Sequence, residues 1–115
     1  MNQLTEFLYQ SETTSHVKIT VGDYNAEGLE IRLPGSDAYF LYINCKRGVL
    51  ACRLANLEVF EKLQLPITIF SAARLNDILI GKPVSLSQNA INMGAGMDMT
   101  GAQLIELFSS DVNEK

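Results

Sequence analysis

Residues 48–63 read GVLACRLANLEVFEKL, and this stretch decides the fold of the chain. Its first part, VLAC, is short and apolar, which is typical of a strand buried on both faces. Asn56 is a good helix N-cap, and the apolar residues Leu57, Phe60 and Leu63 then recur at the spacing of one helical face. We therefore expect a buried strand that runs through one turn into an amphipathic helix.

Three segments before this stretch have the pattern of strands. Residues 16–21 (HVKITV) and 28–33 (GLEIRL) alternate, so each is expected to bury its apolar residues and to point its polar residues, Glu30 among them, outward. Residues 39–43 (YFLYI) are apolar and aromatic throughout, which indicates a strand covered on both faces, inside the sheet or at an interface. The VLAC strand is expected to return beside it as a hairpin partner.

The rest of the chain mixes strands and helices. We expect a short buried strand at residues 67–70, a second short helix at residues 74–80 and a last strand at residues 84–89. Thr100 with Gln103 three residues later matches the capping box that opens a terminal helix. Together the elements predict an α+β fold, with an N-terminal antiparallel β region followed by a mixed sheet packed with about three short helices.

One domain accounts for the chain of 115 residues. We expect residues 15–108 to form it, between a polar N-terminal tail at residues 1–14 and a polar C-terminal tail at residues 109–115. The N-terminal tail is expected to be a frayed helix or a segment that docks on a neighbour. Apolar residues make up 47% of the chain and charged residues 19%, so part of the apolar surface is expected to lie between subunits.

Composition excludes several functional classes. The net charge of -4 and the lack of a basic stripe argue against nucleic acid as a partner. No apolar run reaches the roughly 18 residues of a membrane helix, and the N-terminus lacks the features of a signal peptide, so we expect a cytoplasmic protein without a membrane partner.

Cys45 and Cys52 are expected about 10 Å apart on the hairpin, too far for a disulfide. No metal site or cofactor motif is expected, because the chain has one histidine, two separated cysteines and no carboxylate cluster.

Cys52 is the sharpest candidate for a reactive side chain. It lies just before a predicted helix N-terminus and beside Arg53, which favours a thiol of lowered pKa that acts as a catalytic nucleophile. The simpler interpretation is a small buried hydrophobe that fills the corner between strand and helix. We favour the simpler one, because a nucleophile needs a base and the sequence identifies none.

A glycine loop is the second candidate site. Gly94 and Gly96 precede a helix start at Thr100 and Gly101, where exposed amides suit a phosphate or a carboxylate. Its spacing is neither a P-loop nor a dinucleotide fingerprint, and Asp98 would repel an anion. A flexible connector is therefore the simpler interpretation.

Arg74 and Asp77 form the third candidate site. They lie three residues apart on one face of the second helix, where they could orient a ligand. An ordinary exposed ion pair between the two side chains is the simpler interpretation, and it is the one that we expect.

The order and spacing of these features resemble the YunC-like family, small uncharacterised proteins of bacteria and archaea. The resemblance is clearest in residues 48–63 and covers about residues 15–108. It continues through a set of single residues: Arg74, Asp77, Leu79, Pro83, Gly94, Met99, Thr100 and Gly101.

The chain also departs from the family pattern. Members tend to have Gly-Ala directly after the cysteine and an aspartate at the helix start, where this chain has Arg53, Leu54 and Asn56. Asp98 stands where a glycine is expected. A site that relies on a close backbone approach after Cys52 is thereby put in doubt.

The resemblance implies an α+β fold and an N-terminal β region that assembles the protein into a tetramer, and it implies no known reaction. We therefore expect a cytoplasmic homo-oligomer that acts as a binding or assembly module, with itself as its partner and without a catalytic constellation. One alternative is a small enzyme that uses Cys52 as its nucleophile in an inter-subunit site with Arg53, Arg74 and the glycine loop. The other is an anion-binding or nucleotide-binding protein built on the glycine loop.

Overall fold

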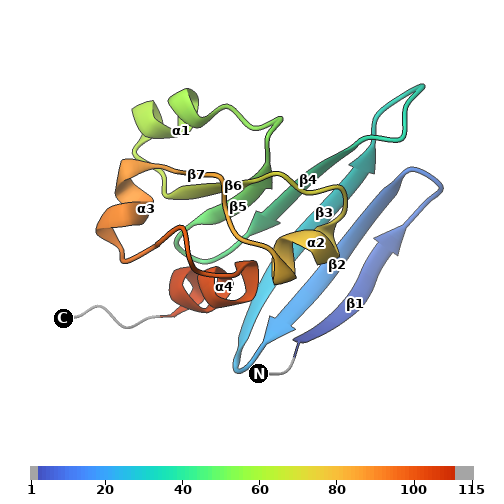
Figure 1. Cartoon of the computed structure of the whole chain (residues 1–115). Coiled ribbons are helices and arrows are strands. Elements are labelled where there is room, and N and C mark those ends of the chain that lie inside the picture. The colour runs from blue at the N-terminus through green and yellow to red at the C-terminus, as the bar shows by residue number, and fades with distance from the viewer. Residues whose placement is uncertain (1–2, 111–115) are drawn as a thin grey trace.

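A single mixed sheet organises the computed structural model, which describes residues 3–110 (Figure 1). Seven strands lie side by side in sequence order, and every neighbouring pair is antiparallel except β5 and β6, which are parallel. The strands are β1 (Gln3–Gln10), β2 (Thr14–Val21), β3 (Tyr24–Arg32), β4 (Tyr39–Asn44), β5 (Val49–Cys52), β6 (Ile67–Phe70) and β7 (Ser85–Leu86). The α+β fold predicted from the sequence is confirmed.

Four short helices pack against the two faces of this sheet. They are α1 (Leu57–Leu63), α2 (Leu75–Ile80), α3 (Gln88–Asn92) and α4 (Gly101–Ser109). Leu57 and Phe60 of α1 pack on one face, over a small buried cluster from β5 and β6. The other three helices contribute to the larger core, which covers the opposite face from β2 to β6. We call the face that carries α1 the outer face and the other the inner face.

Alternating burial along the strands shows which side chains build the larger core. Val17, Ile19 and Val21 of β2 are buried on the inner face, as are Leu41 and Ile43 of β4. These side chains meet the apolar residues of α2 and α4. Figure 1 shows both helices lying across the sheet, while the ribbon of β1, β2 and β3 extends beyond them. The N-terminal ribbon therefore has less helical cover than the rest of the sheet.

Local capping fixes the starts of the two helices that the sequence predicted best. The Asn56 side chain accepts hydrogen bonds from the backbone N–H groups of Glu58 and Val59, which satisfies the start of α1. Thr100 and Gln103 form the predicted capping box at the start of α4. Both helix starts are thus confirmed, because their hydrogen bonds join residues at most three apart.

The N-terminal segment differs from the expected tail. Residues 3–10 form β1, which pairs with β2 along its length, so the expectation of a frayed helix is wrong for these residues. The register shifts between Phe7 and Tyr9, and this bulge interrupts the alternation that would have identified a strand. Residues 1–2 lie outside the described part of the chain.

The C-terminal part also differs in detail. The strand expected at residues 84–89 is limited to β7, and α3 follows it directly. The buried Ser87 hydroxyl accepts hydrogen bonds from the N–H groups of Ala90 and Ile67, so it caps α3 and ties this helix to β6. Of the expected C-terminal tail, Ser109 belongs to α4, while residues 111–115 are outside the described part. None of the helices in residues 3–110 combines the length and the apolar composition that crossing a membrane requires.

Candidate functional site

The carboxyl ends of β5 and β6 open into a cavity of about 330 Å³, which we call the β5–β6 cavity. Because the two strands are parallel, the segments that follow them leave the sheet at the same edge. Ligands of open α/β sheets bind outside the carboxyl ends of their strands for the same geometric reason. Leu33, Cys52, Leu54 and Phe70 supply apolar walls, and Asp37 and Arg53 supply charge.

Cys52 lies at the wall of this cavity with only 4% of its surface exposed. Its sulfur accepts a hydrogen bond from the Leu41 N–H at 3.4 Å and lies 3.9 Å from the Tyr39 carbonyl oxygen, to which the thiol donates. Both contacts occupy the sulfur with backbone partners from β4. Cys52 is therefore a small buried residue in the corner between β5 and α1, which is the simpler of the two interpretations of the sequence.

Within residues 3–110, the imidazole of His16 lies away from Cys52. His16 precedes the inward-facing Val17 in β2, so its imidazole lies on the outer face, where Nε2 is 3.6 Å from a carboxylate oxygen of Glu27. The thiol lies on the inner face, on the opposite side of the sheet. The histidine is therefore not placed to activate Cys52.

Cys45 and Cys52 form no disulfide bond, as predicted, and both thiols are free. Cys45 follows β4 and is buried beside α4. Burial raises the pKa of its thiol to about 12. Cys45 is therefore a protonated, structural residue at neutral pH.

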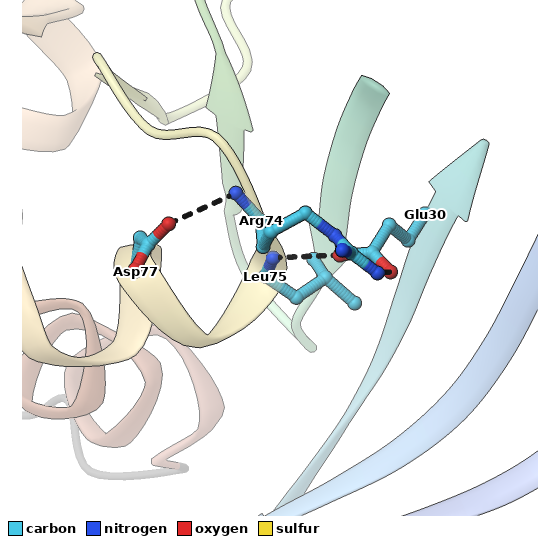
Figure 2. Close-up of polar contacts among 4 residues, drawn as sticks. All are labelled: Glu30, Arg74, Leu75 and Asp77. Carbon is cyan, nitrogen blue, oxygen red and sulfur yellow. Dashed lines mark hydrogen bonds and ion pairs between the residues drawn. The ribbon is translucent and has the colours of Figure 1, made fainter. Parts of the chain in front are cut away.

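Arg74, at the start of α2, joins a compact polar cluster with β3 (Figure 2). Its Nε and Nη2 atoms donate to the two carboxylate oxygens of Glu30 at 2.9 and 2.8 Å. The Leu75 N–H donates to the same carboxylate at 3.0 Å, and the guanidinium carbon lies 4.2 Å from the centroid of the Tyr39 ring. The cluster thus clamps α2 to the inner face of the sheet.

Two expectations about this cluster are wrong. Asp77 does not pair with the Arg74 guanidinium, because its carboxylate accepts from the Arg74 backbone N–H at 3.1 Å instead. Glu30 does not point outward: it is 8% exposed and faces the helices, while Leu29 and Ile31 lie on the outer face. No sequence pattern indicated this burial, because an isolated glutamate in an alternating strand normally faces water.

Opposing effects act on the Glu30 carboxyl. Burial raises its pKa, but hydrogen bonds from Arg74 and from the Leu75 N–H, together with the charge of Arg74, more than offset this and hold the pKa below its usual value. The carboxylate is therefore ionised at neutral pH. Its two oxygens are already used by Arg74 and Leu75, which makes the cluster a structural clamp.

The glycine loop occupies a different part of the molecule. Gly94 has a φ of 106°, which glycine adopts without strain, and Thr100 uses its hydroxyl to cap α4. Gly101 lies against the backbone of Ile78 in α2, and its N–H donates to the Gly81 carbonyl at 3.0 Å. Gly101 is therefore a packing glycine between two helices.

The predicted ligand residues thus fall into three places. Arg53 lies with Cys52 at the β5–β6 cavity, Arg74 is bound to Glu30, and Gly94 belongs with Gly96, Thr100 and Gly101 at the start of α4. Asp37, which also lines the cavity, was missed because it lies in the turn before β4 and no sequence motif marks it. Within residues 3–110, no group of three or more histidine, cysteine or carboxylate side chains is arranged to hold a metal ion.

Comparison with known proteins agrees with this fold. No protein-family model matches the sequence, and no curated protein matches it. Among solved structures the chain is similar to the protein of unknown function TA1206 from Thermoplasma acidophilum, with a TM-score of 0.77 and 22% sequence identity over 88% of this chain and 98% of that one. At this identity the likeness shows the fold alone.

Proposed function

We propose that the protein is a YunC-like assembly module that associates with copies of itself through its N-terminal β-strands, forming a tetramer. The observation that carries the proposal is the free edge of β1. β1 is the outermost strand, and only its β2 side is paired within residues 3–110. The unpaired edge of this eight-residue strand presents backbone N–H and C=O groups to any matching strand edge.

The composition of β1 supports pairing rather than protection. Natural edge strands are commonly guarded by lysine or proline, and QLTEFLYQ contains neither. Its one charged residue, Glu6, lies 3.5 Å from Lys18 of β2. Phe7, Leu8 and Tyr9 are 59%, 49% and 59% exposed in the single chain, so a second copy would remove apolar surface from water.

The outer face supports a second contact. By alternation, this face of β3 and β4 carries Leu29, Ile31, Phe40 and Tyr42, and each is only partly buried. Tyr42 packs against the small cluster under α1, whereas Phe40 also contacts the larger core. Phe40 and Tyr42 stack with ring centroids 6.1 Å apart. Aromatic side chains of this kind are enriched at interfaces. One edge contact and one face contact, each two-fold, are what a tetramer with dihedral symmetry requires.

Native mass spectrometry and light scattering test the proposal. We expect the wild-type protein to be a tetramer at micromolar concentration and the variant Phe7→Lys/Tyr9→Lys to form smaller species, because the added charges repel across the β1 edge. Ile91→Lys is the control: this α3 residue is 46% exposed, close to the exposure of Leu8, and its helix packs near β6, away from β1 and from the outer face. A wild-type monomer, or a double variant that remains tetrameric, would contradict the proposal.

A further inference from the structure

The β5–β6 cavity carries polar groups that the fold does not use. Arg53 and Asp37 line it, both are exposed, and neither makes an ion pair or a side-chain hydrogen bond within residues 3–110. The Arg74 guanidinium nearby is instead bound to Glu30. The Arg53 guanidinium and the Asp37 carboxylate, which have no side-chain partner within residues 3–110, thus lie beside the same cavity.

The backbone adds further donors. Residues 71–73 follow β6 and line the cavity, and within residues 3–110 their three N–H groups donate to no acceptor. Amides of this kind suit a carboxylate, particularly beside an arginine that can bind the same group with two parallel hydrogen bonds. The Arg53 side of the cavity therefore favours an anionic group on a ligand.

The remaining walls favour an apolar ligand body. Leu33, Leu54 and Phe70 line the hollow together with the wall formed by Cys52. A volume of about 330 Å³ lies at the lower end of the range for small-molecule sites. A large nucleotide is therefore a poor match in size, and Asp37 would repel its phosphates.

We propose that the β5–β6 cavity binds a small zwitterion with an apolar body, the chemical class of free amino acids with aliphatic side chains. The ligand carboxylate binds Arg53 and the amides of residues 71–73, and the ligand ammonium binds Asp37. The aliphatic group lies on Leu33, Leu54 and Phe70. The proposal concerns a separate surface from β1 and does not depend on self-assembly.

Isothermal titration calorimetry with three probes tests the charge requirement. L-Leucine carries both charges, 4-methylpentanoate lacks the ammonium, and 3-methylbutylamine lacks the carboxylate. We expect L-leucine to bind at least about tenfold more tightly than either analogue, because each lost charge-assisted contact weakens binding by about that factor. No binding of L-leucine at millimolar concentration, or equal binding of either analogue, overturns the proposal.

Variants locate the binding site. Arg53→Gln and Asp37→Asn are each expected to weaken L-leucine binding about tenfold, and both positions are exposed, so folding is unaffected. Lys82→Gln is the control, because Lys82 is an exposed cation that does not line the cavity. Ala73→Trp, at an exposed cavity residue, is expected to abolish binding by filling the hollow. Binding that survives Arg53→Gln and Ala73→Trp unchanged would place the ligand elsewhere and overturn the assignment.

Discussion

Removing the Arg74 side chain tests how the clamp between α2 and β3 holds the fold. In the variant Arg74→Met, the Glu30 carboxylate loses both hydrogen bonds from the guanidinium and keeps only the one from the Leu75 N–H. Methionine retains much of the aliphatic stem and can still pack on the Tyr39 ring. The change therefore isolates the loss of charge and hydrogen bonds around a buried carboxylate.

The magnitude follows from the burial of the two partners. Removing one partner of a buried ion pair costs about 3–5 kcal/mol, because the other charge stays buried without compensation. The Glu30 side chain is 10% exposed, but that of Arg74 is 53% exposed, so water screens part of their interaction. We expect Arg74→Met to lower the free energy of unfolding by about 2 kcal/mol, or the melting temperature by roughly 8 °C.

The pH dependence gives a sharper signature than the magnitude. In the wild type the folded-state pKa of Glu30 lies below the ordinary glutamate value of 4.5, so the stability that Glu30 contributes is present above pH 4.5 and is lost as pH falls through the lowered pKa. Without Arg74, burial becomes the dominant effect and raises the pKa of Glu30. The variant should then be least destabilised below pH 4.5 and lose stability as pH rises above it.

Urea denaturation at fixed protein concentration, from pH 3.5 to pH 7, measures both effects. Glu30→Gln combined with Arg74→Met should remove the pH-dependent difference, since the buried charge is gone. Lys18→Met is the control: its pair with Glu6 is exposed on both sides, so we expect a loss below about 1 kcal/mol. If Arg74→Met costs no more than Lys18→Met and shows no dependence on pH, the clamp does not stabilise the fold.

Three further predictions concern packing, burial and capping. Gly101→Ala should lower the free energy of unfolding by at least about 3 kcal/mol in thermal denaturation, because the added methyl group overlaps the Ile78 carbonyl. Gly35→Ala is the control, in open space at a φ of 69°, and should cost only about 1–2 kcal/mol. Equal losses in the two variants would refute the close packing at Gly101. Cys45 should resist alkylation by iodoacetamide at pH 8 until urea unfolds the protein, and rapid labelling of the folded protein in mass spectrometry would contradict its burial. Because burial raises the pKa of this thiol, the free energy of unfolding should also fall as pH rises above about 9. Thr100→Ala should cost about 1 kcal/mol in urea denaturation, and the absence of any loss would mean that the α4 capping box contributes nothing.

Residues close together in the sequence were predicted well. Asn56 and Thr100 start helices because their side chains reach N–H groups two or three residues ahead, and that geometry needs no other part of the chain. Local periodicity also located most of the other strands and helices, but it missed β1, whose bulge interrupts the alternation, and it missed α3. These features suffice for the α+β class.

The candidate site was predicted only in part. The sequence singled out Cys52 and Arg53, which do lie together at the β5–β6 cavity. It missed Asp37, because only the folding of the turn before β4 brings that residue beside the ends of β5 and β6. It also missed Glu30 as the partner of Arg74, since the two side chains meet across elements far apart in the chain.

The sequence by itself thus determined the fold class, the starts of α1 and α4 and the separation of the two thiols. Only the tertiary structure decided which face of each strand the helices cover. Alternation tells which side chains of a strand share a face, but the same pattern is compatible with either face being buried. In β3 the buried face is the one with Gly28 and Glu30, because Gly28 leaves room for the Leu75 side chain and Arg74 neutralises the Glu30 carboxylate.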